Sequence, residues 1–282
     1  MAKKKIGIYS PLASTPNQKM EDLFLIVDDH SIAFSVKNIE KNTFVAFEFF
    51  ENEENVEGWG PLMAYLQNNS KLIHAIYRQV HFVLNHSHFI ITKKYDSSDT
   101  LLYQNELSLL HGQLMDAEIQ VNELANGSMI VFAVPDSLIT LLTRTFPIGK
   151  WKHYAEWVIS TKMGQTAEDN SSVQIHLFET NYLLSIQDNG NLKNIKYITS
   201  SSPDQNCYSI LNACQQLGVI PSQMHLQIVG LEYSPNQEMN ETWSQLGTYF
   251  SNTKVISTPT SGIGESLNKE FPHHRYATYF IF

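Results

Sequence analysis

The chain has 282 residues, 43% of them hydrophobic and 11% aromatic, which is enough for two domains with buried cores and excludes an intrinsically disordered protein. Charged residues make up only 17% and the net charge is −9, which disfavours nucleic acid as a partner because nucleic acid is a polyanion. The apolar stretches are shorter than the roughly 20 residues that a membrane helix needs, and none follows the basic residues 3–5 as in a signal peptide. We therefore expect a cytoplasmic protein without a membrane span.

The chain begins with a polar segment and continues with a series of strand-like runs. Residues 1–21 are polar and interrupted by proline, so we predict a flexible N-terminal arm. Three runs rich in apolar, β-branched or aromatic residues follow, separated by short turn-forming segments. They are Asp22–Asp28, Ile32–Val36 and Thr43–Phe50, and they predict a three-strand meander.

The rest of the first half alternates between helical and strand-like patterns. Pro61 suits a first helical turn, and apolar residues at helical spacing predict a helix to about Tyr77. Further strands are expected at Val80–Leu84, Phe89–Thr92 and Met129–Val134, and helices at Asp99–Leu110, Pro135–Thr145 and Trp151–Met163. We expect residues 22–165 to form the first domain, with small α/β elements inserted at about 93–127.

The second half repeats this order of elements. Strands are predicted at Val173–Phe178, Tyr182–Gln187, Leu192–Thr199, Met224–Gly230 and Lys254–Ser257, and helices at Pro203–Leu217 and Pro235–Phe250. The turn Asp188–Asn191 contains Asn-Gly, a strong hairpin signal. Residues 172–282 are therefore predicted to form a second domain. The order of elements, rather than sequence identity, indicates an internal duplication.

A three-strand meander followed by helix, strand, helix and strand is the order of a ribonuclease-H-like domain. Two such domains in tandem predict an α/β protein with the actin-like ATPase architecture. The chain also resembles an uncharacterised bacterial family, domain of unknown function 3822, whose members are similar to the actin-fold pilus-assembly protein PilM. The resemblance extends over nearly the whole chain and is carried by Leu23–Val36, Val131–Pro135 and Phe271–Ala277.

The resemblance implies a nucleotide site in the first hairpin. An active actin-like ATPase holds its nucleotide between its two halves, and in each half a hairpin with glycine wraps a phosphate with backbone amides. In the first half Asp28 stands where an acid would hold Mg²⁺, and the glycine position is taken by His30 or Asp29. The candidate residues are Asp28, Asp29 and Ser31, with Asp28 as the metal ligand. A polar hairpin turn without a ligand is the simpler interpretation.

The second hairpin and a later glycine pair complete the candidate nucleotide site. Glu179 and Thr180 lie in the stretch that corresponds to the first hairpin, but no glycine follows them. Gly262 and Gly264 could lie near adenosine, and a flexible turn explains them equally well. Because both hairpins lack glycine, we expect no ATP hydrolysis and no required cofactor.

Two other kinds of metal site are weaker hypotheses. A two-metal nuclease would need converging carboxylates, for which Asp28 or Asp29, Glu48 and Asp96 are the candidates. Glu48 is explained equally well as a solvated position at a sheet edge, and the acidic chain lacks a basic groove. The histidines do not show the spacing of a zinc site.

Three residues near the C-terminus and the two cysteines have structural interpretations. His273, His274 and Arg275 belong to the family resemblance, and we expect them to make a capping or inter-lobe contact. Cys207 and Cys214 are seven residues apart on one predicted helix, which is too far for a disulfide, so we expect two buried thiols.

The sequence therefore predicts a degenerate actin-like protein, a pseudo-ATPase that acts as a non-hydrolysing binding or scaffold module. By analogy with PilM-like proteins, its partner is a protein or peptide that docks in a groove or adds a strand to a sheet edge. The alternative is a weak ATP-binding protein or ATPase that uses Mg²⁺ in the cleft between the domains.

Overall fold

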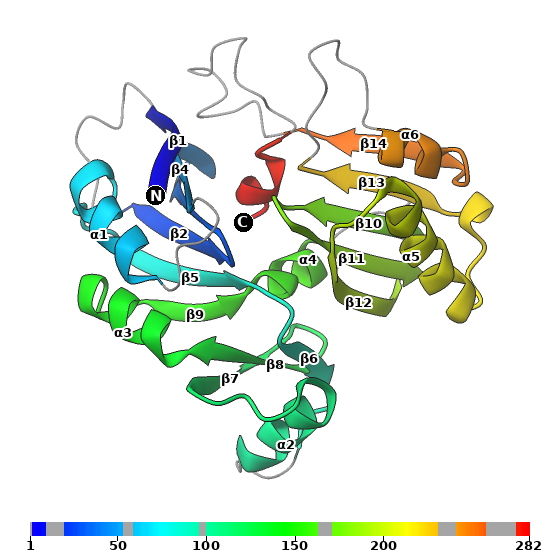
Figure 1. Ribbon diagram of the computed structural model, residues 1–282, viewed down its shortest axis with the longest axis horizontal. Coiled ribbons are helices and arrows are strands. Elements are labelled where there is room, and N and C mark those ends of the chain that lie inside the picture. The colour runs from blue at the N-terminus through cyan, green and yellow to red at the C-terminus, as the bar shows by residue number, and fades with distance from the viewer. Residues whose placement is uncertain are drawn as a thin grey trace. The chain divides into compact units, whose positions relative to one another are not determined.

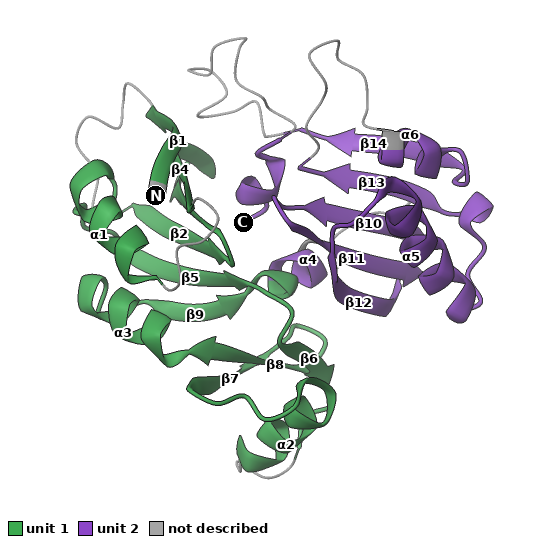
Figure 2. Cartoon of the chain, viewed as in Figure 1, with its two compact units in different colours: residues 1–156, 260–267 green, residues 157–259, 268–282 purple. Residues whose placement is uncertain are grey.

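The computed structural model describes residues 2–9, 20–52, 59–95, 100–162, 171–230, 241–257 and 275–282. The chain divides into two compact units, which Figure 2 shows in different colours. Unit 1 comprises residues 1–156 and 260–267, and unit 2 comprises residues 157–259 and 268–282. The boundary between the units, after Glu156, falls within the helix Tyr154–Lys162. The predicted domain limits of 22–165 and 172–282 placed the boundary after this helix.

The main sheet of unit 1 has six strands in the order β1-β4-β3-β2-β5-β9 (Figure 1). Strands β2, β3 and β4 form the predicted antiparallel meander, and β5 pairs parallel with both β2 and β9. Every residue of β2 is buried, as expected for a central strand that is covered on both faces. The bounds are β1 Ala2–Tyr9, β2 Glu21–Asp28, β3 Ser31–Asn38, β4 Thr43–Asn52, β5 Gln79–Asn85 and β9 Lys150–His153.

The prediction of a flexible arm was wrong for Ala2–Tyr9. This segment is strand β1, which pairs antiparallel with β4 from Ala2 opposite Asn52 to Tyr9 opposite Ala46. The ammonium of Lys4 bonds the buried carboxylate of Glu48 on β4, so a lysine that looks solvated in the sequence belongs to the packed sheet. Residues 10–19 lie outside the described part of the chain.

Helix α1, Gly60–Asn69, is shorter than predicted. Its last bond runs from the Ser70 backbone N–H to the Leu66 carbonyl at 2.8 Å. The Ser70 hydroxyl then accepts the backbone N–H groups of Leu72 and Ile73, each at 3.1 Å, and these bonds begin a separate turn. The predicted continuation of the helix to about Tyr77 was therefore wrong because a serine side chain competes for the backbone donors.

The predicted helix Trp151–Met163 is a strand followed by a helix. Strand β9 pairs Trp151 with Phe82 and His153 with Leu84, and helix α4 covers Tyr154–Lys162. Strand β9 was missed because Trp151 and Tyr154 fit the pattern of a strand as well as that of a helix.

The insertion in unit 1 is a small sheet covered by one helix. Its strands have the order β6-β8-β7, so β6 and β8, predicted correctly as strands, belong to the insertion rather than to the main sheet. Tyr103, Leu107 and Val131 lie in its core. The bounds are β6 Phe89–Thr92, α2 Thr100–His111, β7 Ala117–Glu123 and β8 Met129–Pro135, and α3, Asp136–Thr145, follows directly.

The sheet of unit 2 has the order β12-β11-β10-β13-β14 (Figure 1). This order matches β4-β3-β2-β5-β9 of unit 1, with the same parallel and antiparallel pairs. The predicted hairpin is confirmed, because Asn189 and Gly190 have φ values of 50° and 75°. The bounds are β10 Ser172–Leu177, β11 Asn181–Asp188, β12 Asn191–Thr199, β13 His225–Val229 and β14 Asn252–Ile256.

Two helices of unit 2 pack against each other and contribute to its core. Helix α5, Pro203–Gln216, begins after Ser202, whose hydroxyl accepts the Gln205 backbone N–H. Helix α6 covers Glu241–Gly247, and the predicted start of this helix lies outside the described residues. Cys207 and Cys214 are free and buried in the core, as predicted. Within the described parts of the chain, no helix is long and apolar enough to cross a membrane.

Candidate functional site

A pocket of about 260 Å³ lies in unit 1 at the carboxyl ends of β2 and β5. The last residues of these parallel strands, Asp28 and Asn85, are partners in the strand register. The carboxyl ends of parallel strands form the usual ligand-binding edge of an α/β sheet. The lining residues are Val27, Asp28, Asp29, Asn52, Trp59, Leu84, Asn85, His86, Pro135 and Leu138.

The acidic part of the pocket comes from the β2–β3 turn. Asp28 is only 3% exposed, and its Oδ1 atom accepts the backbone N–H of Asp29 at 2.8 Å. Loss of solvation raises the pKa of the Asp29 carboxyl group, and this rise is partly offset by the charges of His30 and His88. The third predicted residue, Ser31, lies opposite Asp28 in the register and is not among the lining residues.

Asn85 is the most informative residue of the pocket. Its side chain is fully buried, and neither Oδ1 nor Nδ2 has a hydrogen-bond partner among the described residues. A buried amide left in this state costs about 1–3 kcal/mol. Sequence reasoning missed Asn85, although one signal was present: it is a polar residue directly after the apolar residues of a buried strand.

His86 also lines the pocket and is held neutral. Its Nε2–H donates to the Ala133 carbonyl at 2.7 Å, and its Nδ1 accepts the His88 backbone N–H at 2.8 Å. Burial lowers the pKa of His86 to about 4. No lysine or arginine is among the described residues that line the pocket.

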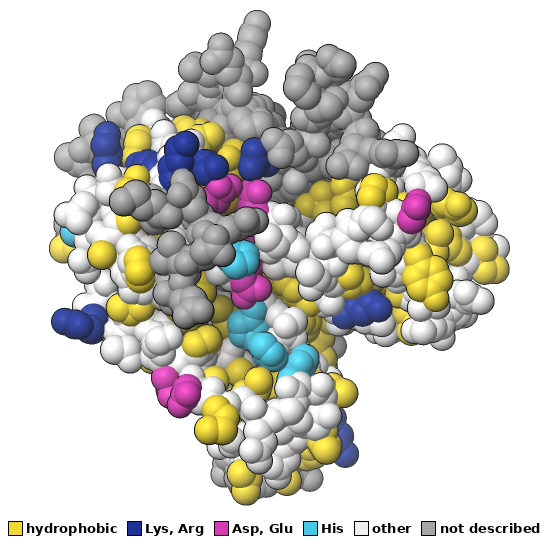
Figure 3. All heavy atoms as spheres, in the orientation of Figure 1, with side chains coloured by type: hydrophobic (Ala, Val, Ile, Leu, Met, Phe, Trp, Pro, Cys, Tyr) yellow, Lys and Arg dark blue, Asp and Glu magenta, His cyan; other side chains and the backbone are white. Residues whose placement is uncertain are grey.

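His86 belongs to a cluster of four histidines, and Figure 3 shows histidine side chains gathered beside acidic ones on one face. The ring centroid of His86 lies 5.0 Å from that of His88 and 6.2 Å from that of His153. The ring centroids of His88 and His111 are 5.3 Å apart. His153 is also bound at both nitrogens by backbone groups. Across the described ranges, no group of three or more His, Cys, Asp or Glu side chains is placed to hold a metal ion.

The predicted residues of the second hairpin are used in contacts within unit 2. Arg275 donates from Nη2 to Glu179 Oε1 at 3.0 Å, and its guanidinium lies 5.6 Å from the Tyr276 ring centroid. Thr180 accepts the Ser200 backbone N–H through its carbonyl. The structure thus brings Glu179 and Arg275 together, whereas Gly262, Gly264, His273 and His274 lie outside the described residues.

The C-terminal segment covers the carboxyl ends of β10 and β13, the edge that corresponds to the pocket in unit 1. Gly230 follows β13 with a φ of +88°, and a Cβ there would lie 2.7 Å from the Leu177 carbonyl oxygen and 2.9 Å from Thr278. Thr278 is fully buried, and the Tyr279 ring meets Phe178 edge to face at 6.0 Å. In Figure 1 this segment, the 3-10 helix Ala277–Phe280, is drawn in red at the arrowheads of these strands.

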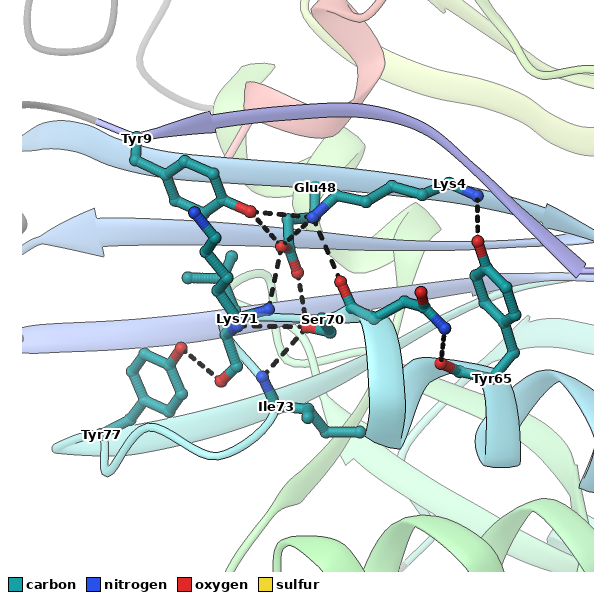
Figure 4. Close-up of polar contacts among 10 residues, drawn as sticks. Lys4, Tyr9, Glu48, Tyr65, Ser70, Lys71, Ile73 and Tyr77 are labelled. Carbon is teal, nitrogen blue, oxygen red and sulfur yellow. Dashed lines mark hydrogen bonds and ion pairs between the residues drawn. The ribbon is translucent and has the colours of Figure 1, made fainter.

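Glu48, considered above as a nuclease ligand or a solvated edge residue, is neither exposed nor free. Its side chain is fully buried and accepts bonds from Lys4 Nζ and Ser70 Oγ, both at 2.5 Å, and from the Tyr9 hydroxyl (Figure 4). Burial alone would raise the pKa of Glu48, but these bonds outweigh it and lower the pKa. A carboxylate with this many donors has a structural role, and Asp96 lies outside the described residues.

The two main sheets, with matching strand orders, place the protein among those with an actin-like ATPase fold. A protein of this fold and of unknown function from Bacteroides thetaiotaomicron superposes with a TM-score of 0.74 at 14% identity, covering 86% of this chain and 93% of that chain. A chain of the PilM–PilN type IV pilus biogenesis complex has a TM-score of 0.57 at 10% identity, covering 93% and 97% respectively. At such low identities these similarities establish the fold alone.

The family model described as "Protein of unknown function (DUF3822)" matches residues 12–277, so the chain belongs to this family. The resemblance and the fold class expected from the sequence are therefore confirmed. No curated protein matches the chain.

Proposed function

We propose that this protein is a non-hydrolysing member of the actin-like fold, which acts as a binding or scaffold module for a protein partner. The observation that carries the proposal is the C-terminal segment over the carboxyl ends of β10 and β13. An ATPase of this fold uses the corresponding hairpins of both halves to hold phosphate. In this protein the carboxyl ends of β10 and β13, the edge at the second of these hairpins, are covered by the buried Thr278 and the packed Tyr279 ring.

ATP and Mg²⁺ fit the described residues poorly. Asp28 could hold Mg²⁺ through water, as an acid at this position does in the ATPases. Phosphate groups would then approach the Asp29 carboxylate with no lysine or arginine among the described lining residues to offset the repulsion. In unit 2 the Glu179 carboxylate is paired with Arg275. These contacts support a protein that does not turn over nucleotide.

Fold analogy and a sheet edge support a protein partner. The PilM–PilN complex is an assembly of two proteins, one of which shares this fold. Strand β12 is one of the two edge strands of the unit 2 sheet, and its residues are exposed or half-buried along its length. An edge strand offers backbone N–H and C=O groups, to which an extended peptide can add as a further strand.

The proposal is tested by measuring ATP turnover and thermal stability with and without millimolar ATP and Mg²⁺. We expect no turnover above background and no rise in melting temperature. A ligand that binds only the folded protein would stabilise it by about 2.7 kcal/mol at a hundredfold excess over its dissociation constant. Hydrolysis that Asp28→Asn removes and the exposed control Asp116→Asn retains would show the proposal to be wrong.

A further inference from the structure

We infer that the pocket of unit 1 binds an uncharged ligand through a primary carboxamide group, and that Asn85 is the residue that recognises this group. The inference goes beyond the proposed function, because it assigns a binding site and a chemical group without reference to ATP. Three features of the pocket carry it: a buried amide without a hydrogen-bond partner, apolar walls, and hydrogen-bond acceptors beside them.

Asn85 is the sign that the pocket takes a ligand. The residue lines the pocket at the end of β5, and its side chain is fully buried. Neither Oδ1 nor Nδ2 has a hydrogen-bond partner among the described residues. Most buried polar side chains in proteins are bonded, because an unsatisfied amide lowers stability. A ligand that bonds both atoms would recover this cost.

The two free atoms of the amide define the chemistry of the ligand. Oδ1 accepts hydrogen bonds, whereas Nδ2 donates them. A cationic group bonds only the oxygen and leaves the nitrogen unpaired, and an anionic group does the reverse. A carboxamide has a donor and an acceptor side by side, so it can form two bonds with Asn85 at once. The amide of Asn85 therefore favours an uncharged amide as its partner.

The walls of the pocket favour an organic group over water, which also offers a donor and an acceptor. The pocket has a volume of about 260 Å³, several times the roughly 30 Å³ that one water occupies in the liquid. A carboxamide reproduces the hydrogen bonds of the water that it displaces, and its carbon atoms remove apolar surface from solvent. Five of the ten lining residues are apolar: Val27, Trp59, Leu84, Pro135 and Leu138.

The other polar groups of the pocket favour a primary amide, which has a second N–H. Asp28 and Asp29 are acceptors when ionised, and a carboxylate has about four lone-pair sites, so it accepts a further bond even when it has other partners. His86 offers no free donor, because its Nε2–H donates to Ala133 and its Nδ1 accepts the His88 backbone N–H. The second N–H of a primary carboxamide thus finds acceptors in this pocket.

The test is an NMR titration of the isotope-labelled full chain with three probes of nearly the same shape. Benzamide carries a donor and an acceptor, acetophenone has a methyl group in place of the NH2 group, and benzamidine is a cation with donors only. We expect benzamide to shift the backbone amide signals of Asp29 and His86. It should bind about tenfold or more tighter than either of the other probes, which corresponds to about 1.4 kcal/mol.

Asn85→Leu removes the amide and keeps a side chain of similar size. The dissociation constant of benzamide should rise about tenfold or more, whereas that of acetophenone should rise less than about twofold, so the preference for benzamide is lost. The control Asn105→Leu, at an exposed asparagine of α2, should leave the preference unchanged. Because Asn85→Leu removes an unpaired buried amide, it should melt no lower than the wild type. If it fails to fold, Asn85→Ala takes its place in the binding measurement.

A fourth probe separates the two sources of the group. Nα-acetyl-glutamine methylamide carries the carboxamide as a protein side chain does. Binding of this probe in competition with benzamide supports a glutamine of a protein partner as the source, and binding of benzamide alone supports a small molecule.

Three results would overturn the inference: no binding of benzamide up to its solubility, binding of acetophenone or benzamidine as tight as that of benzamide, or a preference for benzamide that Asn85→Leu retains. None of these results concerns ATP turnover, so the inference can fail while the proposed function stands. ATP hydrolysis that depends on Asp28 would instead refute the proposed function, whatever the benzamide titration shows.

Discussion

Replacing Glu48 with alanine should lower the free energy of unfolding of unit 1 by about 3–5 kcal/mol. Glu48 is fully buried, and its carboxylate is paired with Lys4 at 2.5 Å, while Lys4 itself is 24% exposed. The substitution removes the charged partner of the Lys4 ammonium, which keeps only its bonds to the Tyr9 hydroxyl and the Asn69 carbonyl. It also removes the acceptor of the Ser70 hydroxyl and of the Lys71 backbone N–H. The cost is large because strand β1 and the end of α1 are held to β4 through the same carboxylate (Figure 4).

Hydrogen exchange of the slowest backbone amides of β3 and β4 measures this change, because such amides exchange only when the unit unfolds. The matched control is Glu51→Ala on the same strand. Glu51 also forms a 2.5 Å pair, with Lys5, but the two side chains are 18% and 38% exposed. An ion pair in contact with water contributes about 1 kcal/mol or less. The reasoning is refuted if Glu48→Ala costs no more than Glu51→Ala.

The pH dependence of the Glu48 effect has a definite sign. The pKa of Glu48 is lowered in the folded protein, so its contribution to stability is present above the unfolded pKa of about 4.5 and is lost as the pH falls through the folded value. The difference between wild type and Glu48→Gln should therefore shrink in acid. A difference that stays constant from pH 7 to pH 3 would contradict the assignment of the charge to Glu48.

The remaining predictions concern backbone strain, a buried histidine and an ion pair. Gly230→Ala should destabilise unit 2 by about 1–3 kcal/mol in urea denaturation, because alanine is strained at a φ of +88° and its Cβ would contact Thr278. An unchanged free energy of unfolding would refute the packing described for the C-terminal segment. Burial lowers the pKa of His153 to about 3, so the free energy of unfolding should fall as the pH drops below about 6.5. His153→Phe should reduce the slope of the free energy of unfolding against pH by about one proton, and an unchanged slope would exclude His153 as its source. Arg275→Gln should cost about 1 kcal/mol or less, because Arg275 and Glu179 are 27% and 33% exposed; a loss above about 2 kcal/mol would show a larger role.

Most of the two main sheets could be predicted because their signals are local. The alternation over residues 32–36, the run of β-branched and aromatic residues at 43–50 and the Asn189-Gly190 turn depend only on neighbouring residues, and they led to the correct strands, hairpin and fold class. The errors occurred where distant atoms decide the structure. Residues 2–9 form a strand because β4 lies beside them, and α1 ends early because Ser70 bonds the following turn.

The candidate site could be predicted only in part. Asp28 was identified from its position in the first hairpin, and the structure places it at the pocket. Asn85 was missed because its importance depends on the absence of hydrogen-bond partners for its side chain among the described residues, which no sequence pattern records. The contact of Arg275 with Glu179 joins residues 96 positions apart, so neither residue alone indicates it.

The sequence by itself determined the order of the elements, the hairpin turns and the absence of glycine from residues 28–31 and 178–182, since each is a property of a short stretch of chain. Only the tertiary structure decided which charges are buried and which edges are covered. Glu48 has a structural role because its buried carboxylate pairs with Lys4, and the carboxyl ends of β10 and β13 are covered by Thr278. Burial and pairing depend on contacts between distant segments, and these contacts exist only in the folded chain.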